Sequence, residues 1–162
     1  MKAISLWQPW ATLMASGAKR IETRSYQPHG LREGQLVAIH AAKHWTAQER
    51  ALCAEDPFFR RYLTLAERRG LWNGAHPPLG GIVAIARFHH AEPTEALYRQ
   101  LTETERAFGD YTPGRFGWVF TAVRPLAIIP ARGMQGIFEW EPPRASELAA
   151  LYLEPARRMQ VH

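Results

Sequence analysis

The sequence predicts an α+β, mainly β protein in which helices surround a small mixed β-barrel. Its 162 residues suit a single domain that buries a hydrophobic core. The strand-like segments are short and helical segments separate only some of them, which argues against a doubly wound parallel sheet. No internal repeat or change of composition marks a boundary. We therefore assign residues 1–162 to one domain, with a helical insertion at about 46–70 and a tail at about 155–162.

The first three elements are predicted to be a strand, a short helix and a second strand. Residues 2–7 form the first strand, and residues 8–16 form the helix because apolar side chains recur there at helical spacing. Pro9 suits the first turn of that helix, where its missing N–H costs little. Gly17 offers a C-terminal stop. Residues 20–25, RIETRS, alternate as a strand does.

The middle of the chain is predicted to hold a buried strand, two helices and the clearest strand of the sequence. The buried strand is QLVAIHAA, residues 35–42. Thr46 followed by Glu49 is the pattern of a capping box, which begins a helix. Pro57 interrupts that helix, and a second one follows it. The clearest strand is GIVAIARFHHAE, residues 81–92.

The last third of the chain is predicted to alternate helices and strands. Residues 94–108 are predicted to be helical, and residues 116–130 to form one or two strands. A last strand follows a glycine-rich turn within 132–141, and residues 142–154 form a C-terminal helix. Residues 155–162 are expected to be frayed.

Charge permits a nucleic-acid partner without requiring one. The chain carries 20 Lys and Arg against 15 Asp and Glu, which gives a formal net charge of +5. Clustered cations attract phosphates, but an Arg-rich solvated surface has the same composition. The alternatives stay open at this point.

Other composition signals predict a soluble cytoplasmic protein with no membrane partner. Cys53 is the only cysteine, which fits a reducing compartment. No signal-peptide pattern opens the sequence, and no apolar run approaches the roughly 18 residues of a membrane helix. Nucleotide-binding loops and the serine nucleophile elbow are absent, so we expect no cofactor. The histidines follow no known metal-ligand spacing, and we expect no metal site.

The segment GAKRIETR gathers charges that suit a binding site. If residues 20–25 are extended, Glu22 and Arg24 lie on one face of the strand, while Ile21 and Thr23 lie on the other. Lys19 sits at the bend before the strand and can reach either side. Between two cations we expect Glu22 to stay ionised. Such a cluster can orient a polar ligand, and the alternative is a surface set of weak ion pairs.

The segment SLWQPW offers aromatic and amide groups beside the same bend. Trp7 and Trp10 can stack on a nucleobase, and Gln8 can read a base edge. Both tryptophans can equally be core anchors, above all Trp10, because it shares helical spacing with apolar neighbours. We include all three residues among the candidate ligand-binding residues.

Two further segments supply candidate ligand-binding residues. His40 ends a buried strand and is the histidine best placed to face a cleft. Arg132 and Gln135 lie on a glycine-framed turn, where glycines permit close approach to a ligand. A simple hairpin turn is the alternative for this segment.

Taken together, these segments resemble the ASCH domain family, a branch of the PUA-like superfamily. The family signature G-x-K-x-x-E-x-R is complete here as Gly17, Lys19, Glu22 and Arg24. The flanking segments follow in the family's usual order: SLWQPWATLMASG, LVAIHAAK, GGIVAIARF, FGWVF and RGMQGIFEW. The similarity runs from about residue 5 to residue 141 and is greatest to the EOLA-like subgroup, which carries helical insertions after the IHAAK strand.

The resemblance implies a PUA-like barrel with a ligand cleft between the first helix and the barrel. It also implies binding of RNA or modified nucleosides. One bacterial branch hydrolyses N4-acetylcytidine with a Lys and a Thr of its signature and a Glu elsewhere. Lys19 matches that Lys, but Glu22 stands at the Thr position, and Thr23 is expected on the opposite face. Some other family members are ribonucleases.

Three functions follow as hypotheses. The first is a binder of RNA or a modified nucleoside, in which Trp7, Gln8, Trp10, Lys19, Glu22, Arg24, His40, Arg132 and Gln135 contact the ligand. The second is an enzyme, either a ribonuclease or an amidohydrolase of N4-acylated cytidine. In the amidohydrolase, Glu22 activates water and Lys19 stabilises the oxyanion. The third is an adaptor whose helices at 46–70 dock a protein partner.

Overall fold

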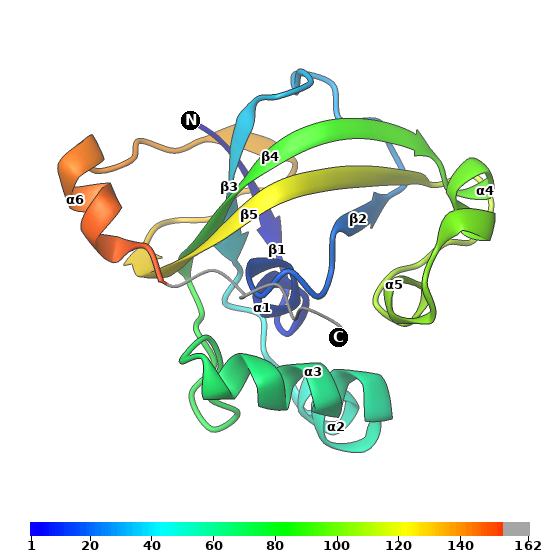
Figure 1. Cartoon of the computed structure of the whole chain (residues 1–162), viewed down its shortest axis with the longest axis horizontal. Helices are drawn as coiled ribbons and strands as arrows, with labels where there is room; N and C mark the ends of the chain where they lie inside the picture. Colours follow the sequence, from blue (N-terminus) through cyan, green and yellow to red (C-terminus); the bar gives the residue numbers. More distant parts are fainter. Residues whose placement is uncertain (154–162) are drawn as a thin grey trace, which may run out of the picture.

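The computed structural model describes residues 1–153 of the chain, so the predicted tail at 155–162 lies outside the described residues (Figure 1). The strands are β1 (Lys2–Leu6), β2 (Ile21–Arg24), β3 (Leu36–Ala41), β4 (Gly81–Pro93), β5 (Phe116–Pro130) and β6 (Ile137–Glu139). The helices are α1 (Trp10–Ala15), α2 (Ala47–Glu55), α3 (Pro57–Arg68), α4 (Thr94–Leu97), the 3₁₀ turn η1 (Tyr98–Gln100), α5 (Glu103–Ala107) and α6 (Ala145–Leu151).

The described strands form one mixed sheet in the order β2-β5-β4-β3-β1-β6. The β1–β3 pair is parallel, and the other pairs are antiparallel. The sheet curls into a half-barrel (Figure 1). The predicted α+β class and the mixed sheet are therefore confirmed. β2 and β6 are the edge strands of the sheet. Because β6 pairs only with residues 2–4 of β1, the end of β1 at Ser5 and Leu6 is unpaired on that side, and β2 lies across an open seam from it, near enough for Arg24 to reach the Ser5 carbonyl.

The segment at 116–130 is a single strand, one of the two predicted alternatives. Its pairing with β4 shifts register between Ile85 and Arg87, whose partners on β5 are Arg124 and Thr121. Between these two pairs β5 has two residues, Ala122 and Val123, opposite the single Ala86 of β4, and Ala122 has a φ of 49°. Such bulges bend and twist a strand, so they help the long β4–β5 ribbon to curl.

The beginning of α1 differs slightly from the prediction, while its end agrees with it. The helix begins at Trp10 because Pro9 occupies the N-cap position rather than the first turn. Gly17 follows the last turn with a φ of 82°, a conformation that glycine adopts without strain. The chain then turns directly into β2, which brings Lys19 beneath the strand.

The segment at 94–108 is largely helical, as predicted, but it is not one continuous helix. The chain forms α4, η1 and α5 instead, with an extended residue at Leu101. Thr102 then begins α5, because its hydroxyl accepts the Glu105 N–H at 3.1 Å. Threonine is a poor interior helix residue and a good N-cap, and this local bond favours a new helix over continuation of the old one.

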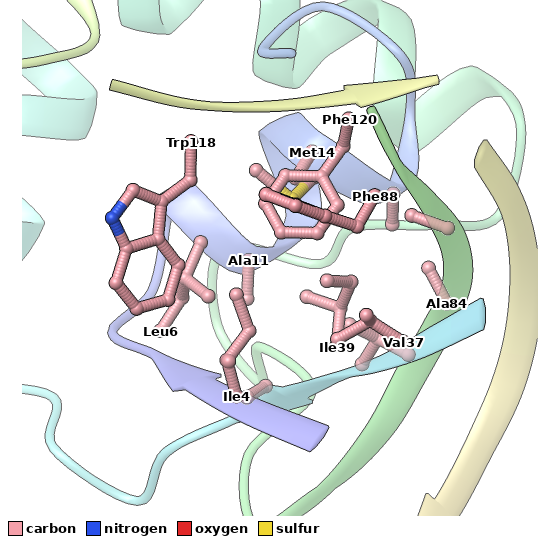
Figure 2. Packing of buried hydrophobic residues seen from close by; sticks show 14 residues of the cluster. Ile4, Leu6, Ala11, Met14, Val37, Ile39, Ala84, Phe88, Trp118 and Phe120 are labelled. Atoms are coloured by element: carbon pink, nitrogen blue, oxygen red, sulfur yellow. The ribbon is translucent and has the colours of Figure 1, made fainter. Parts of the chain in front are cut away.

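The core lies between the concave face of the sheet and α1. Figure 2 shows Ala11 and Met14 of α1 directed toward sheet side chains that include Trp118 and Phe120. A second cluster lies on the other side of α1 and joins it to α3 and α5. Its buried members are Leu13, Phe59, Leu63, Ala66, Leu71, Trp72 and Phe108. α1 is thus sandwiched between the sheet and the α2–α3 pair (Figure 1).

Two short helices begin at side-chain caps in the predicted insertion. The predicted capping box of Thr46 and Glu49 is present at the start of α2. Asp56 accepts the N–H groups of Phe58 and Phe59 at 2.9 and 3.3 Å, and Pro57 follows it in the first turn of α3. Among residues 1–153, no helix is both long and apolar enough to cross a membrane.

Candidate functional site

A hollow of about 630 Å³ opens at the seam between β1 and β2. Its walls come from the end of β1, the start of α1, the strand β2 and the loop that follows α5. It is lined by residues 5–7, 10, 19, 22–24, 107–110 and 115. We call it the smaller hollow. It contains Lys19, Glu22 and Arg24 of the GAKRIETR segment, so these three residues form part of a concave site rather than a flat surface.

Glu22 and Arg24 project from the same face of β2, as the alternation predicted. Ile21 and Thr23 between and beside them are buried. The Arg24 Nε donates to Glu22 Oε1 at 2.9 Å, and the other carboxylate oxygen lies 3.6 Å from the Lys19 Nζ. Glu22 is therefore an anion held between two cations at the edge of the hollow.

Arg24 also connects the two sides of the seam. Its Nη2 donates to the backbone carbonyl of Ser5 at 2.7 Å, and its guanidinium carbon lies 5.8 Å from the centroid of the Trp118 ring. An arginine side chain has five N–H donors, and these bonds engage two of them. The remaining N–H donors are available to a ligand, because Arg24 lines the hollow.

Lys19 is almost wholly buried, with 1% of its surface exposed. Its Nζ donates to the carbonyl oxygens of Ile21 and Phe108, the second at 3.1 Å. Together with the ion pair to Glu22, these contacts account for the three N–H groups of the ammonium. Lys19 thus ties the α1–β2 turn to the loop after α5, and a ligand oxygen can replace only its loose contact with Glu22.

The two tryptophans occupy different environments along the smaller hollow. Trp7 is 53% exposed, and its ring stacks on that of His44 with centroids 3.8 Å apart. His44 is itself held by Glu49, at 2.9 Å. Trp10 packs edge-on against Phe59 at 5.9 Å and joins both hydrophobic clusters. Trp7 therefore presents an aromatic wall, whereas Trp10 is mainly a core anchor with one edge on the hollow.

Gln8 lies in the interior and lines neither this hollow nor the one described next. Its side chain is fully buried. The amide NH₂ donates to the Thr12 hydroxyl and to the Pro78 carbonyl, at 2.9 and 2.8 Å, and the amide oxygen accepts the Thr12 N–H at 3.0 Å. The structure thus contradicts the prediction that Gln8 contacts the ligand, because its hydrogen bonds satisfy groups of the protein itself.

A second hollow of about 1180 Å³ adjoins the first and contains the remaining candidates. It is lined by residues 5, 7, 24, 26, 40, 42, 43, 80 and 130–136. We call it the larger hollow. The two hollows share Ser5, Trp7 and Arg24. The predicted site is therefore divided, with His40, Arg132 and Gln135 on one side of these shared residues and Lys19 and Glu22 on the other.

His40 forms part of the floor of the larger hollow. Its Nδ1 lies 2.9 Å from the Ser5 hydroxyl, and its Nε2 lies 2.9 Å from the carbonyl of Ala131. Burial lowers the pKa of the imidazole, and the bond to Ala131 opposes that shift. Both ring nitrogens are engaged by the protein, so His40 fixes the loop at 130–136 rather than offering a free nitrogen to a ligand.

The loop after α5 contributes residues that sequence reasoning missed. Asp110 and Arg115 line the smaller hollow and lie 3.5 Å apart. The pKa of Asp110 is lowered, chiefly because the Thr112 hydroxyl donates to it. Thr23 also contributes to the lining, although the alternation of β2 predicted that it faces away, and its hydroxyl accepts the Asp110 N–H at 3.1 Å. No local sequence motif marks this loop as part of the site. The loop reaches the site because it leads into β5, which pairs with β2.

A buried carboxyl and a buried phenol lie beneath the smaller hollow. Glu105 Oε1 accepts the Arg20 N–H, whereas its Oε2 and the Tyr111 hydroxyl have no hydrogen-bond partner among residues 1–153. Burial raises the pKa of Glu105, and the charge of Lys19 opposes the rise. Burial and the two nearby carboxylates of Glu105 and Glu22 raise the pKa of Tyr111 as well. Glu105 is therefore a second carboxyl near Lys19, in addition to Glu22, and the sequence pattern did not indicate it.

In the described part of the chain, residues 1–153, no three His, Cys, Asp or Glu side chains lie together so that they could hold a metal ion.

Comparisons with known proteins identify the fold of this chain. The model of the ASCH domain matches residues 4–109. The crystal structure of ASCH from Zymomonas mobilis is similar at 14% identity and a TM-score of 0.54, covering 95% of this chain and 96% of that one. A point mutant of the same Zymomonas mobilis protein gives 15% identity, a TM-score of 0.53 and coverage of 93% and 97%. No curated protein gives a significant match. The EOLA-like assignment stays a prediction.

Proposed function

This chain belongs to the ASCH domain family, and from that premise we propose that it binds RNA or a modified nucleoside in the smaller hollow beside α1. ASCH domains are generally associated with RNA. The observation that carries the proposal is the ion pair of Glu22 and Arg24 in a hollow walled by the exposed ring of Trp7. We propose further that the half-barrel is the PUA-like fold that the family resemblance implies.

Each group in the hollow has a role that matches a nucleobase. The Glu22 carboxylate can accept a hydrogen bond from an exocyclic amine, as carboxylates do from cytosine N4. The free N–H groups of Arg24 can donate to a base carbonyl or a phosphate oxygen. Trp7 can stack on the base, because every base offers a π face to an aromatic ring. Lys19 acts behind this surface by holding Glu22 in place.

Hydrolysis of an acylated nucleoside is the second candidate, and one observation favours it. A buried ammonium and a carboxylate lie 3.6 Å apart in the hollow, which is the pair of groups needed to stabilise an oxyanion and to activate water. The geometry favours binding over hydrolysis, however. The Lys19 N–H groups are directed at the Ile21 and Phe108 carbonyls, and Glu22 is already engaged by Arg24.

The adaptor hypothesis has less support from the packing. The apolar face of α3 is occupied, because Phe59, Leu63 and Ala66 are buried in the cluster that joins α3 to α1. The exposed positions of α3 mix charged residues with the separate apolar side chains of Phe58 and Leu65. We therefore keep the nucleic-acid ligand as the proposed function.

Titration calorimetry at low salt tests the proposal with cytidine, N4-acetylcytidine and a cytidine pentanucleotide as probes. Glu22→Gln keeps the size of the side chain and removes its charge, so we expect binding to weaken about tenfold or more. Glu33→Gln removes one charge from an exposed position outside the hollow and is the matched control. The proposal fails if none of the probes binds, or if Glu22→Gln binds like the wild type. Chromatographic detection of cytidine and acetate from N4-acetylcytidine would instead support the hydrolase.

A further inference from the structure

The larger hollow differs from the smaller one in its balance of charged side chains. Among the described residues that line the larger hollow there is no Asp or Glu, whereas Arg24, Lys43 and Arg132 are all cations. The smaller hollow instead sets Glu22 and Asp110 against its cations. Clustered cations without counter-charges favour phosphate, and a mixed set of charges favours the polar edge of a base.

Exposed aromatic side chains border the larger hollow. Trp7 stands on the boundary between the two hollows, and Tyr26 is 41% exposed although its backbone is anchored. That anchor is the Trp118 indole N–H, which donates to the Tyr26 carbonyl at 3.0 Å, and the two rings meet edge to face at 5.5 Å. A tyrosine held in this way exposes a ring face on which a base can stack at low entropic cost.

The cationic rim is built on a fixed loop. His40 bonds to Ala131, and at Gly133 an added Cβ would lie 2.7 Å from the His40 Nδ1 and 2.8 Å from the Ser5 hydroxyl. The backbone at Gly133 therefore lies directly on the buried imidazole. This contact holds Arg132 and Gln135 at the rim of the hollow instead of leaving them on a free hairpin.

The size of the combined site exceeds what one nucleoside needs. Ligand pockets for single small molecules are about 300–1,000 Å³. The larger hollow alone is about 1180 Å³, and it continues through the shared residues into the smaller one of about 630 Å³. A ligand that fills both must be longer than a nucleoside and must carry negative charge on one side.

We infer that the ligand is a single-stranded polynucleotide that runs through both hollows. One base enters the smaller hollow beside Glu22, and the backbone passes over Arg24 and Trp7. The phosphates of the neighbouring nucleotides lie between Lys43 and Arg132, with a second base against Tyr26. This inference rests on the proposed function, because it assumes the base site of the smaller hollow and adds the phosphate track.

The test compares two probes on two double variants. We propose to measure the dissociation constants of cytidine and of the cytidine pentanucleotide at several salt concentrations. The double variant Lys43→Ala with Arg132→Ala removes the two cations that line the larger hollow alone, and it leaves Arg24, which both hollows share. The control, Arg32→Ala with Arg99→Ala, removes the same charge from exposed positions that line neither hollow.

For the wild type we expect the pentanucleotide to bind at least about tenfold more tightly than cytidine. The Lys43 and Arg132 variant should lose about tenfold in pentanucleotide affinity at low salt while cytidine affinity stays unchanged. Its salt dependence should also fall by about 1.4 in logarithmic slope, because each phosphate contact on a single strand contributes about 0.7. The control should match the wild type in both measurements.

The possible failures are distinguishable. The polynucleotide track is overturned if cytidine and the pentanucleotide bind equally well, or if the double variant binds the pentanucleotide like the control. In either case, sensitivity of cytidine binding to Glu22→Gln would leave the proposed function standing. If neither probe binds the wild type, both the proposed function and the track are overturned.

Discussion

His40 and Gly133 determine the floor of the larger hollow through one contact. The imidazole is buried and hydrogen-bonded at both nitrogens, so it has little freedom to move away from a larger neighbour. Gly133 does not have a positive φ, and alanine could adopt its backbone conformation. Any effect of a substitution there must therefore come from the side chain that meets His40.

Gly133→Ala should destabilise the protein by about 1–3 kcal/mol, the usual cost of forcing an extra methyl group into a packed site. The new Cβ would lie 2.7 Å from the His40 Nδ1, so the ring or the loop must shift. Urea unfolding measures the change. Gly74→Ala is the control, since its Cβ would meet only Trp72 at 3.7 Å. Equal stability of the two variants would contradict this account of the contact.

At the scale of single elements, the start of α2 is coupled to the wall of the cleft. Glu49 accepts from the Thr46 backbone N–H at 2.8 Å and from its hydroxyl, and it also holds His44, on which Trp7 stacks. These bonds lower the pKa of Glu49 to about 2, mainly through the Thr46 hydroxyl. The helix cap and the aromatic wall thus share one carboxylate.

The lowered pKa of Glu49 predicts a pH dependence of stability. The ionised carboxylate stabilises the folded state fully above the unfolded pKa of about 4.5, and this contribution is lost as pH falls toward about 2. Glu49→Gln should therefore cost about 1 kcal/mol at neutral pH. The difference from the wild type should nearly vanish once the pH reaches the folded-state pKa of about 2.

Urea unfolding at neutral and acidic pH measures this difference. Glu55→Gln removes a carboxylate from the exposed end of the same helix and should show no such trend. A destabilisation of Glu49→Gln that is the same at both pH values would show that the charge is not responsible.

At the scale of the whole molecule, the α2–α3 pair is part of the same packed body as the sheet. Phe59 of α3 is 3% exposed and meets Trp10 and Phe108 edge-on, at 5.9 and 4.9 Å. Trp10 also lines the smaller hollow, and the Phe108 carbonyl accepts from Lys19. One side chain of the insertion therefore supports two walls of the candidate site.

Phe59→Ala should cost about 3–5 kcal/mol, because it leaves a cavity beside two aromatic rings. It should also weaken cytidine binding, since Trp10 and Phe108 lose their support. Denaturant unfolding and titration measure the two effects. Phe58→Ala, at a neighbouring position that is 36% exposed, is the control.

A single transition in every variant would support the assignment of residues 1–162 to one domain, which stays a prediction. Two separate transitions, with only one shifted by Phe59→Ala, would contradict it.

The order of the elements follows from local signals, and the division within one predicted helical segment has a local cause as well. Alternation at 20–25 and the stop at Gly17 predicted β2 and the end of α1, because strand period and glycine conformation depend on near neighbours. At 94–108 the same reasoning predicted helical structure but not its division, which the capping bond of Thr102 sets at the start of α5.

By itself, the sequence determined the mixed α+β class, because strand and helix periods are local patterns. It also determined the charged cluster on β2 and its neighbourhood with Trp7, because these residues lie close together in the chain. Only the tertiary structure decided that the cluster faces an open seam bridged by Arg24, that Asp110 and Arg115 join it, and that His40 and Arg132 belong to a second hollow. It also turned Gln8 inward. The physical reason is that a buried polar group takes whichever partner the fold brings to it, and for these residues the partners come from distant parts of the chain.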